Sequence, residues 1–91
     1  MSILFDKIII KEGVDMKREN SELHRRLGLK IAYYRKLKGL TQEQLAEEVK
    51  KSVAFIGAVE APNVYRTVSL DTLFDIAKAL DVPPYKFLSE D

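Results

Sequence analysis

The sequence has 91 residues and a mass of 10.4 kDa, enough for one small domain, because a second hydrophobic core requires a longer chain. Its 46% hydrophobic and 32% charged residues exclude a disordered or fibrous protein and indicate one that folds. The net charge is only +1, but residues 21–51 carry eight basic and four acidic side chains, whereas residues 69–91 carry two basic and five acidic ones. This uneven distribution of charge is what a domain with one face toward a polyanion needs, although a solvated helix face gives the same pattern.

Residues 1–20 differ in character from the rest of the chain. Their large apolar residues are Ile3, Leu4, Phe5, Ile8, Ile9 and Ile10. These types favour strands, and a charged, turn-like run follows them. We therefore divide the chain into an N-terminal arm, residues 1–20, and a folded domain, residues 21–91. The arm is either an ordered strand or helix that packs on the domain or on a second subunit, or a frayed terminus. Its exposed apolar surface favours a packing or dimerising role.

Residues 21–38 have the apolar spacing of an amphipathic helix. The apolar positions recur at intervals of three and four and form one stripe: Leu23, Leu27, Ile31, Tyr34 and Leu37. Gly39 is suited to the left-handed conformation that closes a helix, and the basic residues of the last turn oppose the negative end of the helix dipole. We expect this helix to end at Lys38.

A second helix is predicted to start after Thr41. Thr41 and Gln44 have the spacing of a capping box, and Leu40 can pack on Leu45 as a hydrophobic staple. The helix then buries Leu45, Ala46 and Val49. A third short helix is expected over residues 53–60, capped by Ser52, with Ile56 and Val59 facing inward and Pro62 ending it.

Two further helices complete the predicted fold. Ser69 caps a fourth helix, whose expected buried stripe consists of Leu70, Leu73, Ala77 and Leu80. Pro83-Pro84 can begin a fifth, because proline is tolerated in a first helical turn. Its apolar residues, Tyr85, Phe87 and Leu88, would then fold back onto the core. We see no strand in residues 21–91, so the predicted class is all-α with five helices.

The second and third helices, joined by a tight turn, form a helix-turn-helix, whose second helix can lie in the major groove of DNA. The chain resembles the phage-repressor-like, XRE-type helix-turn-helix regulators of bacteria and phages over residues 27–47, Ser52, and residues 55–60, 69–82 and 84–88. The resemblance implies a compact five-helix domain that binds double-stranded DNA sequence-specifically as a homodimer and regulates transcription. It further implies a repressor of bacterial or prophage origin. We expect no effector domain within these residues, so any ligand sensing would require a regulatory protein partner.

The resemblance also assigns candidate DNA contacts. Gln42, at the start of the first motif helix, would approach a phosphate or support the base-reading side chains. The positions directed at base edges are Ser52, Val53, Ala54 and Ala58. Their alanine and valine side chains can contact a thymine methyl group but cannot make a bidentate hydrogen bond. Readout should therefore depend on DNA shape, on phosphates and on the flanking residues Lys50, Lys51, Asn63, Tyr65 and Arg66.

Arg35 and Glu60 match a pair that forms a structural salt bridge in this family. Three features depart from the family pattern. Lys50 occupies the turn position where the family usually has glycine, so either the turn is strained or the second helix continues. Ala61-Pro62 replaces the usual polar-glycine step, and the loop to Ser69 is longer.

The chain lacks the usual parts of an enzyme. His24, which we expect at the surface, is its one histidine, and there is no cysteine, so we predict no catalytic residues, no metal site and no cofactor. Apolar runs are far below the roughly 20 residues of a membrane span, and no secretory signal begins the sequence, so we expect a cytoplasmic protein without a membrane partner. The alternative function is a helical protein-interaction module, antitoxin-like or a phage accessory protein, with weak or no specific DNA reading.

Overall fold

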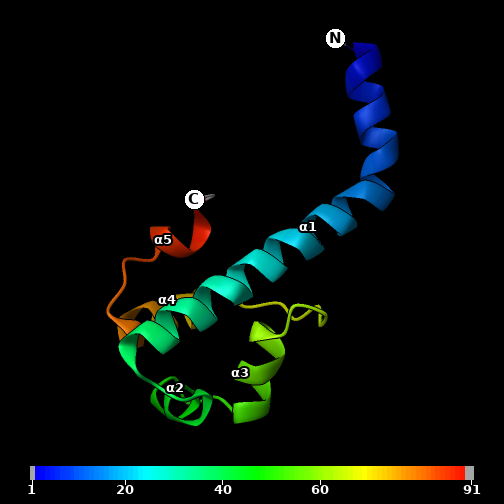
Figure 1. Ribbon diagram of the computed structural model, residues 1–91. Coiled ribbons are helices and arrows are strands. Elements are labelled where there is room, and N and C mark those ends of the chain that lie inside the picture. Colours follow the sequence, from blue (N-terminus) through cyan, green and yellow to red (C-terminus); the bar gives the residue numbers. More distant parts are fainter. Residues whose placement is uncertain (1, 90–91) are drawn as a thin grey trace.

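The computed structural model describes the backbone of residues 2–89 and the side chains of residues 20–89. Five helices make up the fold: α1 (Ser2–Lys38), α2 (Gln42–Glu48), α3 (Val53–Glu60), α4 (Leu70–Leu80) and α5 (Tyr85–Leu88). The predicted all-α class is confirmed, and residues 2–89 contain no strand. In Figure 1, α1 crosses the whole molecule, with α2 and α3 on one side of it and α5 on the other.

The first helix is much longer than predicted, because it begins at Ser2 and not near Ser21. Residues 2–20 therefore continue the first helix of the domain. Once a helix has nucleated, each added residue gains a hydrogen bond, which offsets the modest strand preference of isoleucine. Figure 1 shows this part of α1 projecting past the other helices and bent away from the rest. The predicted packing of its apolar residues, including Ile3 and Phe5, lies outside the described side chains.

Short polar residues start three of the helices, as predicted. The Thr41 side chain accepts a hydrogen bond from the Gln44 amide, and the Gln44 side chain accepts one from the Thr41 amide, which completes the capping box before α2. Ser52 and Ser69 cap α3 and α4 in the same way, with Oγ accepting from backbone amides at 3.0 and 3.1 Å. Gly39 closes α1 with a φ of 85°, the left-handed conformation expected of it.

All five helices contribute to one hydrophobic core. Its buried members are Leu27, Ile31, Leu45, Ala46, Val49, Ile56, Val59, Leu73, Ile76, Ala77, Leu80 and Phe87. The inward-facing residues predicted for α2 and α3 are confirmed. Ile76, which the sequence reading missed, is fully buried in α4. None of the helices in the described part of the chain is long and apolar enough to cross a membrane.

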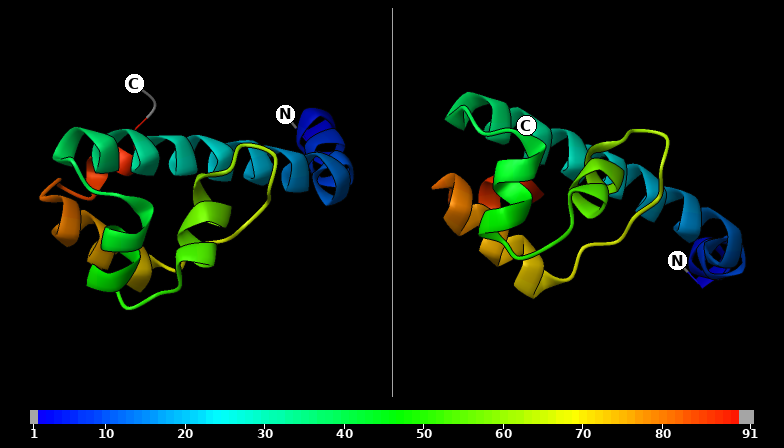
Figure 2. Two further views of the ribbon diagram at one scale, coloured as in Figure 1. Left: turned by 60° about the horizontal axis from the view of Figure 1, so that its bottom comes forward. Right: turned by 90° about the horizontal axis from the view of Figure 1, so that it is seen from below.

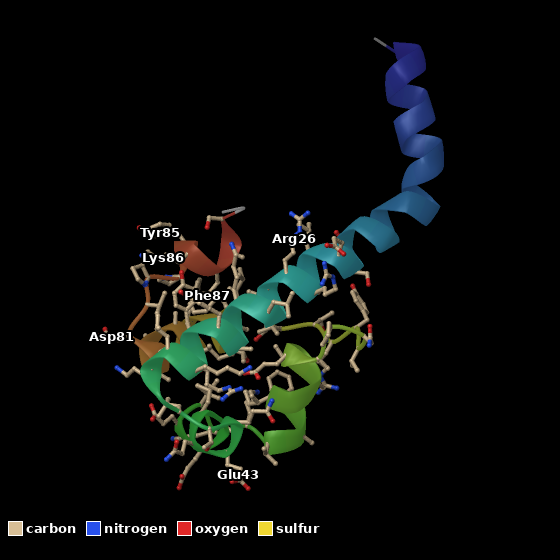
Figure 3. All side chains as sticks on the ribbon, in the orientation of Figure 1. Arg26, Glu43, Asp81, Tyr85, Lys86 and Phe87 are labelled. Atoms are coloured by element: carbon tan, nitrogen blue, oxygen red, sulfur yellow. The ribbon has the colours of Figure 1, made fainter. Side chains whose placement is uncertain are left out.

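Five of the predicted core residues are instead exposed: Leu23, Leu37, Leu70, Tyr85 and Leu88. Each lies at one end of a predicted stripe, outside the residues that form the core. The last helix has only four residues, so one side chain of α5, Phe87, reaches the core. Figure 3 shows Phe87 between α5 and α1, whereas Tyr85 lies on the outer side of α5. Phe87 makes an edge contact with Tyr34, whose ring centroid is 5.4 Å away.

Candidate nucleic-acid interface

A tight turn joins α2 to α3 and includes a strained residue. Lys50 has a φ of 58°, in the left-handed region that favours glycine. The next amide, that of Lys51, donates a hydrogen bond to the Ala46 carbonyl at 2.9 Å and so closes α2. Of the two alternatives for this position, a strained turn and a longer helix, the chain adopts the strained turn. The left-handed conformation costs a non-glycine residue about 1–2 kcal/mol.

Close backbone contact sets the distance between α3 and α1. A Cβ atom built on Gly28 would overlap the carbonyl oxygen of Val59, so a glycine is required where the two helices meet. Ile56 and Val59 fill the core beneath this contact. The inner face of α3 is therefore held against α1 without a gap for a larger side chain.

A buried ion pair links the same two helices. Arg35 Nε and Nη2 donate to the two carboxylate oxygens of Glu60 at 2.7 and 2.9 Å, and Arg35 Nη1 donates to the Leu40 carbonyl at 2.7 Å. Both residues of the pair are only 7% exposed. The hydrogen bonds to Glu60 raise the pKa of Arg35 above its ordinary value, although burial acts in the opposite direction. The pair therefore favours the charged form of the guanidinium.

Gln42 extends this network to α2. Its Nε2 donates to Glu60 Oε1 at 2.9 Å, and the side chain is half-buried. An added Cβ on Gly57 would lie 3.6 Å from Gln42 Oε1, so the amide lies along α3. The side chain is thus fixed between the two motif helices, with one of its polar groups already paired.

The outer face of α3 presents short side chains. Val53 is 44% exposed, Ala54 and Ser52 are exposed, and Ala58 is half-buried. Figure 2 shows α3 below α1, with its first turn pointing away from the long helix. The N-terminal half of α3 is therefore open to a partner, whereas Ile56, Val59 and Glu60 are turned inward.

Five flanking residues expected to contact DNA are all exposed: Lys50, Lys51, Asn63, Tyr65 and Arg66. The last three belong to the loop between α3 and α4, which passes beside α1 before it returns to α4 (Figure 2). Tyr65 meets His24 edge-on, with ring centroids 5.2 Å apart. His24 is therefore not a surface residue as predicted but is half-buried, with its Nδ1 enclosed, because the longer loop covers it.

Phe55, which the sequence reading did not single out, gathers two of the flanking cations. The Lys51 ammonium lies 5.6 Å from the centroid of its ring, and the Arg66 guanidinium carbon lies 5.0 Å from it. An aromatic residue in the first turn of the third helix, with basic residues before and after that helix, is the signal that could have indicated this cluster. In the part of the chain that the structure describes, no three His, Cys, Asp or Glu side chains gather as a metal site.

Comparison with known proteins identifies the family. The helix-turn-helix family model HTH_3 matches residues 31–87, which run from the last eight residues of α1 through most of α5. No curated protein matches the chain significantly. Among solved structures, the chain is similar to the restriction-modification controller protein C.AhdI from Aeromonas hydrophila, with 33% sequence identity and a TM-score of 0.65. The match covers 70% of this chain and 94% of that one. The chain belongs to the XRE-type helix-turn-helix family of DNA-binding regulators.

Proposed function

We propose that this protein is a sequence-specific transcriptional regulator that binds duplex DNA with α3 in the major groove. The observation that carries the proposal is that one face of α3 packs against the domain and the opposite face is exposed. Its inner face is held to α1 by Gly28 and by the Arg35–Glu60 pair. Its outer face exposes Val53 and Ala54 between cationic segments. A helix presented in this way matches the docking geometry of helix-turn-helix proteins.

The side chains divide into two groups by their chemistry. Ser52, Val53, Ala54 and Ala58 are placed to contact base edges, where methyl groups can recognise thymine. The flanking Lys50, Lys51, Asn63, Tyr65 and Arg66 are placed to contact the backbone, and their cations would release counterions on binding. Gln42 supports α3 through its hydrogen bond to Glu60. On this assignment most of the affinity comes from phosphates, and the specificity comes from a few apolar contacts and from DNA shape.

We further propose that the protein acts as a homodimer on a pseudo-palindromic site. One module of this size buries too little surface for a specific complex, whereas two half-sites about one helical turn apart supply twice the contact. A regulator of this kind represses when its site overlaps a promoter. The similarity to a restriction-modification controller protein supports a role in controlling genes and a bacterial or prophage origin.

The test is selection of binding sites from random duplexes at low and moderate salt. We expect enrichment of a palindrome, an affinity that falls steeply with salt, and a dimer on the selected site by sedimentation equilibrium. Ala54→Glu places a negative charge on the exposed turn of α3 and should abolish enrichment without unfolding the protein. Tyr85→Glu, the matched control, adds the same charge on exposed α5, on the other side of α1, and should leave the selected sequence unchanged.

The second candidate, a protein-interaction module, is favoured by the absence of long polar side chains on the outer face of α3. It predicts weak binding that salt abolishes and no enriched sequence. In that case Ala54→Glu and Tyr85→Glu would have the same effect on DNA affinity. The exposed turn of α3 would then be the surface to test for binding of a protein partner.

A further inference from the structure

Two cations contact the same aromatic ring, that of Phe55, which is unusual in a domain of this size. Lys51 and Arg66 are separated by 15 positions in the sequence, yet both lie over Phe55. They come from different segments, the turn before α3 and the loop after it, so the tertiary fold and not helix periodicity brings them together.

Each partner in this cluster is held by its own contacts. Phe55 is half-buried against the core, and its amide donates to Ser52 Oγ at 3.0 Å, which places the ring in the first turn of α3. Lys51 is fixed at the backbone by the hydrogen bond from its amide to the Ala46 carbonyl. Arg66 follows Tyr65, whose ring packs on His24 of α1. The ring of Phe55 is therefore the common support for two otherwise long and mobile side chains.

The two positive charges of this cluster are not balanced by a carboxylate among the described side chains. Among the described side chains, neither Lys51 nor Arg66 makes a salt bridge to a carboxylate; those found join Arg25 and Arg26 to Glu22, and Arg35 to Glu60. Two positive charges held near one ring repel each other, and an anion within reach of both would offset that repulsion. A guanidinium that covers a ring with its face keeps its N–H edges free to donate to phosphate oxygens.

We propose that Phe55 is a positioning residue for a phosphate clamp formed by Lys51 and Arg66, which grips the DNA backbone beside α3. This inference rests on the proposed DNA binding and adds a residue that does not touch DNA itself. The ring restricts both cations before binding, so less side-chain entropy is lost when the phosphate is contacted. The clamp contributes affinity for any duplex and adds no sequence preference.

The test compares substitutions that separate the aromatic face from apolar bulk. Phe55→Leu keeps an apolar contact with the core but removes the ring, whereas Phe55→Tyr keeps the ring. We expect Phe55→Leu to weaken binding to the selected duplex and to a scrambled duplex equally, by about fivefold, and Phe55→Tyr to bind as the unmodified protein does. In Phe55→Leu, the plot of log affinity against log salt concentration should have a shallower slope. The change should correspond to the loss of about one phosphate contact.

A double-mutant cycle then connects the ring to the cation. Arg66→Gln removes the guanidinium charge, and in that background Phe55→Leu should weaken binding by only about twofold, because the ring then restricts Lys51 alone. A selected duplex carrying one uncharged methylphosphonate at the gripped position should bind the unmodified protein and Phe55→Leu almost equally. Thermal unfolding of each variant is followed alongside, so that a loss of folded protein is recognised.

The outcomes separate this inference from the function on which it rests. If the unmodified protein binds no duplex, the proposed function fails and the clamp fails with it. If it binds DNA but Phe55→Leu and Phe55→Tyr lose equal affinity, or Phe55→Leu keeps the full salt slope, or the cycle is additive, then the clamp alone is overturned. An effect of Phe55→Leu confined to the selected sequence would also overturn it, because it would make Phe55 a base-reading residue.

Discussion

The inner and outer faces of α3 are built on opposite principles. The inner face is buried and closely packed: Gly28 allows backbone contact with α1, and the Glu60 carboxylate accepts three hydrogen bonds from Arg35 and Gln42. The outer face has short side chains and an aromatic ring covered by cations from two flanking segments. The comparison teaches that the buried side of α3 fixes its position, whereas its outer side and the cations beside it form the surface that we propose for DNA. Substitutions on the inner face should thus change the free energy of unfolding, and substitutions on the outer face should change the affinity for DNA.

Breaking the buried ion pair should have the largest effect. Glu60→Ala leaves the Arg35 guanidinium buried without a counter-charge, and we expect a loss of about 3–5 kcal/mol in the free energy of unfolding by urea denaturation. Replacing both partners, Arg35→Met with Glu60→Leu, removes the uncompensated charge and should recover most of that loss. A double variant no more stable than Glu60→Ala would show that the pair does not act through its charges.

Adding a methyl group at the contact between α1 and α3 should rank second. Gly28→Ala forces Cβ into the Val59 carbonyl, so α3 must move, and we expect a loss of about 1–3 kcal/mol. Gly57→Ala is the matched control, because its Cβ would have only ordinary contact with Gln42; there the gain in helix propensity is about 0.5–1 kcal/mol. Thermal unfolding of the two variants should shift in opposite directions, and a similar loss in both would contradict the close-contact argument.

Relieving the strained turn should give a smaller effect of opposite sign. Lys50→Gly removes the penalty of a left-handed lysine, and after the added entropy of glycine in the unfolded chain we expect a gain of about 1 kcal/mol. Asp81→Gly tests the same conformation at the end of α4, where φ is also 58°. Aspartate tolerates this region better than lysine, so its gain should be smaller. If Lys50 and Asp81 gave equal gains in chemical denaturation, the cost would not depend on the side chain.

The exposed ion pair on α1 should give the smallest effect and contrast with the buried one. Hydrogen bonds from Arg25 hold the pKa of Glu22 below its ordinary value. Because the folded-state pKa is lowered, the stabilisation is present above the ordinary carboxyl pKa and is lost as the pH falls through the lowered value. Glu22→Gln should therefore shift the urea midpoint slightly at neutral pH and not at all in acid. A difference that grew on acidification would contradict this sign.

Local chemistry explains why much of the fold was predictable. Thr41, Ser52 and Ser69 each accept a hydrogen bond from the amide three residues away, and Gly39 adopts the left-handed conformation that glycine favours, so each signal acts within one helical turn. The end of α1 and the starts of α2, α3 and α4 followed from these signals. Exposure was predicted less well: Leu23, Leu37 and Leu70 continue the apolar periodicity, but periodicity does not tell where the neighbouring helix ends.

By itself, therefore, the sequence determined the five-helix order, the caps and the short, weakly polar character of the outer face of α3, because those properties depend on neighbouring residues. Tertiary structure alone decided which cations would meet. Lys51 and Arg66 converge on Phe55, and the loop that carries Arg66 covers His24, because α3 and the chain on both sides of it pack against α1. Such contacts join segments that are distant along the chain, and their geometry exists only once the core has formed.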